Sequence, residues 1–211
     1  MPRTEPFDLH YDRYEEWFER HGPVYESELR AVRTLFPRSG LAAEVGVGSG
    51  RFAAPLGIRV GVEPSLAMAR LARERGIQVA RGVAEALPLR SGSLDVVLMV
   101  TTICFVDDPF LAFEEIGRVL KPGGHVLVGF IDRTSHLGQQ YERMKEQNVF
   151  YRLATFYSTA DIFDLLTRTG FAELQTVQTV FRSLEEIEVP EPVEEGHGRG
   201  AFVVVRGRKR R

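Results

Sequence analysis

Three alternating glycines behind a carboxylate form the part of the chain where residue types and spacing point most directly to chemistry. Residues 44–50 read Glu-Val-Gly-Val-Gly-Ser-Gly and follow a short apolar segment, residues 41–43. Glycine lacks a Cβ atom and tolerates positive φ, so the backbone here can turn sharply and approach a ligand closely. At the end of a strand in an α/β sheet, such a loop is typical of a nucleotide-binding site.

The spacing of these glycines differs from that of a dinucleotide-binding loop. The dinucleotide fingerprint is Gly-x-Gly-x-x-Gly, and its third glycine lets the helix pack closely against the strand. In this chain Gly46, Gly48 and Gly50 alternate, and Arg51 stands where that third glycine is needed. A nicotinamide-dependent dehydrogenase is therefore disfavoured.

A second carboxylate, Glu63, follows the next predicted strand at residues 58–62. A carboxylate in this place can accept hydrogen bonds from the two vicinal hydroxyls of a ribose, and a bidentate charge-assisted arrangement is strong. Ligands of open α/β sheets lie outside the carboxyl ends of the strands. Glu63 and the glycine loop are therefore expected to share one site.

The elements that must position these residues alternate between strands and helices. We expect strands over residues 41–45, 58–62, 77–80, 95–100 and 125–131, and two late strands over about 173–181 and 200–206. We expect helices near residues 50–55, over 66–75, from 109 to about 120, around 137–147 and over 160–169. The predicted N-caps are Ser65, the pair Asp107-Asp108 before Pro109, and Ser158 or Thr159.

This order of elements predicts an α/β fold, a doubly wound, Rossmann-like and mostly parallel sheet of seven strands with an antiparallel last strand. At 211 residues the chain is expected to form one domain with a sizeable core. Residues 7–36 are rich in aromatic and charged residues, and their apolar positions recur at helical spacing. Two helices broken at Gly22-Pro23 are expected there, because proline disfavours helical geometry in the residue before it.

Composition narrows the classes of function and location. The formal net charge is -2, so no overall field favours nucleic acid or an anionic membrane. The single cysteine, Cys104, excludes an internal disulfide framework and a cysteine-cluster metal site, and no metal is expected. No apolar run approaches the ~18 residues of a membrane span, and no signal sequence is recognisable, so a cytoplasmic location is expected. The basic residues 206–211 are expected to be a solvated, fraying terminus rather than a binding patch.

Four further motifs follow the glycine loop and Glu63 in a fixed order. They read Ala-Glu-Ala-Leu-Pro-Leu at 84–89, Ser-Leu-Asp-Val-Val-Leu-Met at 93–99, Phe-Val-Asp-Asp-Pro at 105–109 and Glu-Ile-Gly-Arg-Val-Leu-Lys-Pro-Gly-Gly-His-Val-Leu-Val at 115–128. The ordered set resembles the class I S-adenosylmethionine-dependent methyltransferases. It is most similar to the small-molecule group that includes the ubiquinone and menaquinone biosynthesis methyltransferases. The resemblance covers residues 41–131, and residues 157–206 more loosely.

The resemblance implies S-adenosylmethionine as cofactor, S-adenosylhomocysteine as product and a methyl acceptor that is expected to be a small molecule. It implies a division of the chain into an N-terminal helical lid (1–37), a cofactor-binding half (38–131) and a substrate-side connection with the late strand pair (132–211). It further implies that the methionine part of the cofactor is held by Glu44 and by the backbone around Gly46, Val47, Gly48 and Gly50.

For the rest of the cofactor, the resemblance implies that Glu63 takes the ribose hydroxyls. It implies that adenine is flanked by Pro64, Ser65, Ala84 and Glu85, and that the sulfonium lies near Thr101 and Thr102. Many relatives carry an aspartate before the Ala-Glu pair, where it accepts from the adenine amino group, but this chain has Val83. Adenine must then be bound by backbone groups, by Glu85, or less tightly.

The acceptor side is less well marked. Candidate residues there are Tyr11, Tyr14, His21, Cys104, His136 and Tyr141, but packing or helix capping is the more frequent role for such residues, and no catalytic residue or general base is predicted. The segment after the fourth strand reads Thr-Thr-Ile-Cys, not the Asn/Asp-Pro-Pro-Tyr type of motif found in amino-methylating nucleic-acid enzymes. A protein or nucleic-acid methyltransferase and a non-catalytic cofactor-binding module stay as alternatives.

Overall fold

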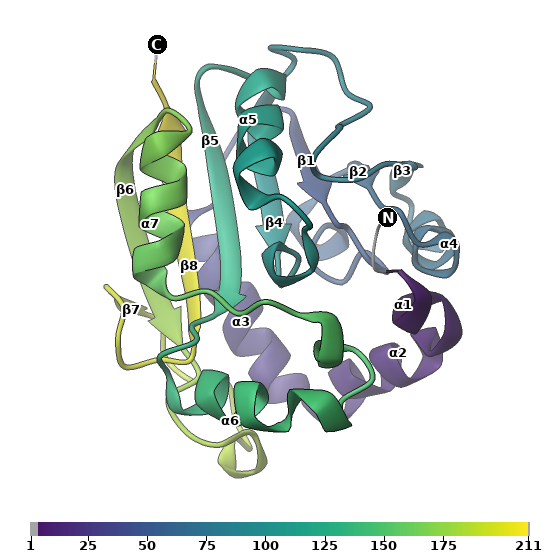
Figure 1. Ribbon diagram of the computed structural model, residues 1–211, viewed down its shortest axis with the longest axis vertical. Coiled ribbons are helices and arrows are strands. Elements are labelled where there is room, and N and C mark those ends of the chain that lie inside the picture. Colours follow the sequence, from purple (N-terminus) through teal and green to yellow (C-terminus); the bar gives the residue numbers. More distant parts are fainter. Residues whose placement is uncertain (1–3, 211) are drawn as a thin grey trace.

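The computed structural model describes residues 4–210, and its core is one mixed β-sheet with helices on both faces (Figure 1). Successive side chains of strand β4 (Leu94–Val100) point to opposite faces, so Val96, Leu98 and Val100 enter one core while Val97 and Met99 enter the other. Helix α3 (Gly22–Leu35) covers the first face, and helices α5 (Pro109–Val119) and α7 (Thr159–Arg168) cover the second.

The sheet has eight strands in the order β3-β2-β1-β4-β5-β8-β6-β7, so the predicted number of seven is wrong. Besides β4, the strands are β1 (Ala42–Val45), β2 (Val60–Val62), β3 (Gln78–Ala80), β5 (Leu120–Ile131), β6 (Phe171–Thr179), β7 (Glu194–Glu195) and β8 (Phe202–Lys209). The additional strand is β7, a two-residue element that pairs with β6 at the edge of the sheet. Strands this short leave no recognisable alternation in the sequence.

The direction of the strands follows the prediction of a mostly parallel sheet with a late antiparallel pair. Strands β1 to β5 are mutually parallel, and β8 runs antiparallel between β5 and β6. The connection from β1 leads outward to β2 and β3, and the chain then returns to place β4 on the other side of β1. In open α/β sheets, ligands bind at such a reversal, outside the carboxyl ends of the strands.

The N-terminal segment folds into helices α1 (Glu5–Leu9), α2 (Tyr11–Arg20) and α3, where two helices were predicted. The predicted break is present: α2 ends before His21, and Pro23 lies in the first turn of α3, where its missing N–H group is tolerated. The helix predicted near residues 50–55 is wrong. The chain forms turns there, followed by a single 3₁₀ turn, Ala54–Leu56.

The predicted helix caps are confirmed. Ser65 caps α4 (Leu66–Glu74) by accepting from the Met68 N–H group at 3.2 Å, and Asp108 caps α5 by accepting from Leu111 N–H at 3.0 Å. Ser158 is the N-cap of α7 and forms a reciprocal capping box with Asp161. The connection after β5 contains α6 (His136–Met144) and the 3₁₀ turns Lys145–Gln147 and Tyr151–Leu153.

The basic C-terminal segment does not fray as expected, because β8 continues through Lys209 in the interior of the sheet. Its long side chains bury their stems and hydrogen-bond at their tips. Arg206 donates to the Leu35 carbonyl at 3.1 Å, and Lys209 donates to the Leu120 carbonyl at 2.8 Å. Arg211 lies outside the described residues. No helix within residues 4–210 is both long enough and apolar enough to cross a membrane.

Candidate active site

A cavity of about 790 Å³ lies at the carboxyl ends of β1, β2, β4 and β5. Its lining comes from α1, α2 and α3, from the loops that follow these strands, from α6 and from residues 148–151. The predicted cofactor residues that line it are Gly46, Gly48, Glu63, Pro64, Ala84, Glu85, Thr101 and Thr102. The remaining predicted residues, Glu44, Val47, Gly50 and Ser65, lie behind this lining.

The three glycines of the loop have different surroundings although all have positive φ, at 67°, 54° and 87°. A Cβ atom on Gly46 would lie 2.2 Å from the Thr102 side chain, and one on Gly48 would lie 3.4 Å from the Tyr14 hydroxyl. A Cβ atom on Gly50 would lie 2.5 Å from the Ile77 side chain. Gly46 and Gly48 therefore form the wall of the cavity, whereas Gly50 makes room for packing behind it.

Glu63, which directly follows β2, is hydrogen-bonded to the glycine loop. Its two carboxylate oxygens accept from the backbone N–H groups of Gly48 and Ser65, each at 2.9 Å. Burial raises the pKa of Glu63 to about 7, although these two hydrogen bonds favour the charged form. Because each carboxylate oxygen has a second lone pair, Glu63 can still accept from hydroxyl groups of a ligand.

Glu44 is a buried carboxylate with an unsatisfied oxygen. It is 2% exposed, and within residues 4–210 no donor reaches its Oε2 atom. Burial raises the pKa of this carboxyl well above its usual range. An acceptor without a donor at this depth is costly, so a positive charge at the adjoining glycine loop would be favourable.

The end of β4 is tied to the glycine loop by Thr102. Its hydroxyl lies 3.2 Å from the Gly46 carbonyl and 3.0 Å from the Val100 carbonyl. Thr101 has a φ of 47°, which non-glycine residues rarely adopt, and its N–H group donates to the Gly129 carbonyl at 2.7 Å. Such strained positions cluster at functional sites, where the surrounding structure holds them.

Two of the predicted adenine residues also have structural partners. Glu85 Oε1 accepts from the N–H groups of Asp107 at 2.7 Å and Asp108 at 3.2 Å, which fixes the segment before α5. Ser65 is fully buried, and its hydroxyl donates to Asp8 at 2.6 Å, so α1 is docked on the start of α4. The side chain of Ser65 thus supports the cavity from behind.

The other end of the cavity is walled by aromatic rings from distant parts of the chain. Phe7 packs edge-to-face on Phe105 with 5.0 Å between ring centroids and lies 5.3 Å from Phe150. Tyr141 and Tyr151 continue the wall, with their centroids 4.8 Å apart. Of the acceptor-side candidates, Tyr14 and Tyr141 line the cavity, whereas the residues outside its lining are Tyr11, His21, Cys104 and His136.

Sequence reasoning missed Glu28 of α3 at this aromatic end, together with the rings of Phe7, Phe105, Phe150 and Tyr151. Glu28 lines the cavity although it is only 5% exposed. A signal was present, because Glu28 stands at helical spacing from Val24, Val32 and Leu35 and therefore on the apolar face of the helix. A carboxylate on such a face requires a partner or a function.

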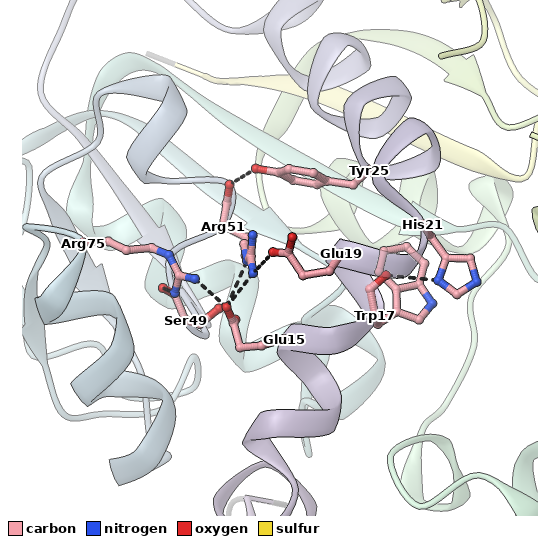
Figure 2. Close-up of polar contacts among 8 residues, drawn as sticks. All are labelled: Glu15, Trp17, Glu19, His21, Tyr25, Ser49, Arg51 and Arg75. Atoms are coloured by element: carbon pink, nitrogen blue, oxygen red, sulfur yellow. Dashed lines mark hydrogen bonds and ion pairs between the residues drawn. The ribbon is translucent and has the colours of Figure 1, made fainter. Parts of the chain in front are cut away.

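Helix α2 is fastened to the glycine loop by a cluster of charged side chains, shown in Figure 2. Glu15 of α2 accepts from Arg51 at 2.7 Å and also from Arg75, and Arg75 in turn donates to the Ser49 carbonyl at 2.7 Å. Burial raises the pKa of Glu15, but hydrogen bonds from neighbouring side chains, including these guanidinium groups, outweigh it and hold the pKa below its usual value. Arg51, which replaces the third glycine of a dinucleotide loop, thus anchors the helix that covers the cavity.

Comparison with known proteins places the chain among the methyltransferases. The family described as "Methyltransferase domain" matches residues 43–128. A crystal structure from Thermotoga maritima shares 52% identity and a TM-score of 0.96, covering 98% of this chain and 100% of that one. It is described as an S-adenosylmethionine-dependent methyltransferase and a possible histamine N-methyltransferase.

Two further proteins are similar over the whole chain. An uncharacterised protein of Methanocaldococcus jannaschii is 38% identical over 203 residues, which cover 96% of this chain and 98% of that protein. A chain from the complex of the Haloferax volcanii Trm112 activator with a methyltransferase has the same fold, with a TM-score of 0.73, 19% identity and coverage of 100% and 99%. The fold, the family match and the 52% identity together show that the chain belongs to the S-adenosylmethionine-dependent methyltransferases and uses S-adenosylmethionine as its cofactor.

Proposed function

We propose that the enzyme methylates a small molecule bound inside the cavity. The observation that carries this proposal is the composition of the cavity wall, in which the glycine loop and Glu63 at one end and the aromatic rings at the other belong to one space. Its volume of about 790 Å³ lies in the upper part of the range for small-molecule sites, ~300–1,000 Å³, and suits a cofactor with a small acceptor.

The residues at the glycine-loop end fit S-adenosylmethionine, which supplies a methyl group on a positively charged sulfur. The backbone at Gly46 and Gly48 allows close approach of the methionine part, and the unsatisfied Glu44 oxygen behind this loop would favour its cationic amino group. Glu63 would accept from the ribose hydroxyls. With Val83 in the usual place of an aspartate, the backbone of residues 83–85 would bind adenine, because the Glu85 carboxylate is engaged by the start of α5.

Catalysis in this site would depend mainly on positioning and on exclusion of water. The leaving group departs without charge, so neither an oxyanion hole nor a metal is intrinsically required. Reactants aligned at ~3–3.5 Å gain several kcal/mol over free encounter. Helices α1 and α2 and residues 148–151 would act as the lid, because their side chains line the cavity opposite the sheet.

The finer assignments rest on resemblance. The T. maritima relative's description as a possible histamine N-methyltransferase supports a small acceptor for this chain too. Membership of the ubiquinone and menaquinone group and a cytoplasmic location stay predictions from the sequence.

A labelled-methyl transfer assay tests this function. The full chain is incubated with methyl-labelled S-adenosylmethionine and with the metabolite, protein and nucleic-acid fractions of a cell extract. We expect label in the metabolite fraction. Label confined to protein or nucleic acid would replace the proposed acceptor class, and binding of S-adenosylhomocysteine without transfer to any fraction would favour a non-catalytic binding module.

A further inference from the structure

Glu28 is a carboxylate in the aromatic end of the cavity that the structure leaves without a partner. It lies on the buried face of α3, is 5% exposed and lines the cavity. Within residues 4–210, no hydrogen bond and no ion pair is formed by its carboxylate. Two other carboxylates of the chain do have partners. Glu63 accepts hydrogen bonds from two backbone N–H groups, and Glu15 accepts hydrogen bonds from two guanidinium groups.

The surroundings of Glu28 contain rings rather than cations. When ionised, Glu28 would raise the pKa of the phenol groups of Tyr14, Tyr141 and Tyr151, which come from α2, α6 and the second 3₁₀ turn after α6. Burial alone raises the pKa of Glu28 to about 8. The cavity's arginines, Arg13 and Arg20, are exposed on α2 and make no ion pair with Glu28.

A buried carboxylate surrounded by aromatic rings has a known chemical complement. A protonated amine can donate to the carboxylate, and the faces of the rings attract the same cation while covering an apolar body. An anionic or neutral acceptor would leave Glu28 protonated and uncharged, whereas a bound cation would stabilise its charged form. Removing an unpaired carboxylate from an apolar helix face would stabilise a protein, so its presence indicates a ligand.

We propose that the acceptor of this methyltransferase is a small molecule with a protonated amine on an apolar body, and that Glu28 binds the amine. This proposal rests on the proposed function, since it concerns the acceptor end of the same cavity. Glu28 and the rings of Phe105, Tyr141 and Tyr151 would then set the substrate class, while the glycine-loop end binds the cofactor.

Matched pairs of amines and alcohols test the proposal. The full chain is saturated with S-adenosylhomocysteine and titrated by calorimetry with benzylamine and benzyl alcohol, 2-phenylethylamine and 2-phenylethanol, and histamine and its alcohol analogue. We expect at least one amine to bind ten times or more tightly than its alcohol partner, the factor for one charge-assisted hydrogen bond. If no pair shows this preference, the proposal is wrong.

Two variants assign the preference to Glu28. Glu28→Gln keeps the shape of the side chain and should reduce the preference for the amine to threefold or less without changing the affinity for S-adenosylhomocysteine. Glu26→Gln makes the same chemical change on the same helix, where Glu26 pairs with Arg30 at 2.9 Å away from the cavity, and should retain the full preference. A preference that survives in Glu28→Gln would overturn the role of this residue.

The cofactor titration separates the two proposals. If the wild-type chain fails to bind S-adenosylhomocysteine, the proposed cofactor roles are wrong. If the chain binds it and no amine is preferred over its alcohol, the amine proposal alone is wrong.

Discussion

Three buried carboxylates lie at the cavity: Glu28 and Glu63 line it, and Glu44 lies behind its lining. Burial raises the pKa of each one, but their partners differ. Glu63 is held by backbone N–H groups, Glu44 has one unsatisfied oxygen, and Glu28 has no hydrogen-bond partner within residues 4–210. This arrangement agrees with the proposal that the cofactor and the acceptor both bring positive charge.

Removal of the Glu63 carboxylate should weaken cofactor binding. In Glu63→Ala we expect the affinity for S-adenosylmethionine to fall by ~1.5–3 kcal/mol, the range for hydrogen bonds to a charged group. Isothermal titration calorimetry measures this affinity, and Glu74→Ala is the control because Glu74 pairs with Arg70 on the exposed face of α4. Equal affinities for Glu63→Ala and the wild type would remove Glu63 from the cofactor site.

The Glu28 carboxyl should make folding stability depend on pH. Its pKa is about 8 in the folded chain and ~4.3 in an unfolded one. Below pH ~4.3 the Glu28 carboxyl is protonated in both the folded and the unfolded state. Between this value and about 8 only the unfolded state releases the proton. In that range the free energy of unfolding therefore falls by roughly 1.4 kcal/mol per pH unit. The advantage in unfolding free energy of Glu28→Gln over the wild type should therefore grow by roughly 2–3 kcal/mol from pH 5.5 to 7.5.

Urea denaturation at the two pH values measures this difference. Glu26→Gln is the matched control and should show a constant difference from the wild type, because its carboxylate is on the solvent side of α3. A pH-independent gain for Glu28→Gln would mean that this carboxyl is not buried in solution.

At the scale of elements, the attachment of α2 to the glycine loop links the proposed lid to the proposed cofactor site. The Glu15 carboxylate accepts hydrogen bonds from Arg51 of the loop and from Arg75 at the end of α4. The Tyr25 hydroxyl of α3 donates to the Arg51 carbonyl (Figure 2). Partly buried charge pairs of this kind hold a helix in one orientation, and loss of one partner leaves the others unpaired.

Loss of the Glu15 charge should loosen α2. In Glu15→Gln we expect the opening free energy of α2 to fall by about 1–3 kcal/mol, because Arg51 and Arg75 lose their shared acceptor. Hydrogen exchange of residues 11–20 measures this change. Glu19→Gln removes a carboxylate that is 73% exposed and pairs with Arg51 alone, so exchange in that variant should stay close to wild type. Identical exchange in both variants would contradict the attachment.

Local signals predicted the elements better than their pairing. The caps Ser65, Asp108 and Ser158 were recognisable because a cap depends on a few neighbouring residues. The strand β7 and the early start of β5 at Leu120 were not, since both depend on which strand lies alongside. The sequence predicts a loose end at Arg206, Arg208 and Lys209 because it does not show that β8 lies between β5 and β6.

For the whole molecule, binding and closure are expected to be coupled. The cavity is closed by α1 and α2 from the start of the chain and by residues 148–151 from the segment after β5. Helix α1 is docked on the start of α4 through Asp8 and Ser65, directly after the Glu63 loop. A ligand at Glu63 therefore stabilises elements that are distant in sequence.

S-adenosylhomocysteine should protect the lid from hydrogen exchange. At a ligand concentration of about 100 times Kd, exchange of amides in α1 and α2 should slow by up to about 100-fold, provided that these helices open only in the free protein. Mass spectrometry of peptides covering residues 5–20 measures this protection, with peptides of α7 as an internal control away from the cavity. Protection confined to the glycine loop would refute a lid role.

The sequence by itself predicted the proposed cofactor end of the cavity. Two properties made this prediction possible from the sequence. The alternating glycines and the later motifs reflect local backbone geometry, and Glu63 follows a predicted strand, so it is expected at the common edge where parallel strands end. Only the tertiary structure pointed to the proposed acceptor end. Glu28 looks like an ordinary helix residue until α3 packs against the sheet and brings it to Tyr141 and Tyr151, more than a hundred residues away. Burial and the absence of a partner are properties of packing, which no short stretch of sequence contains.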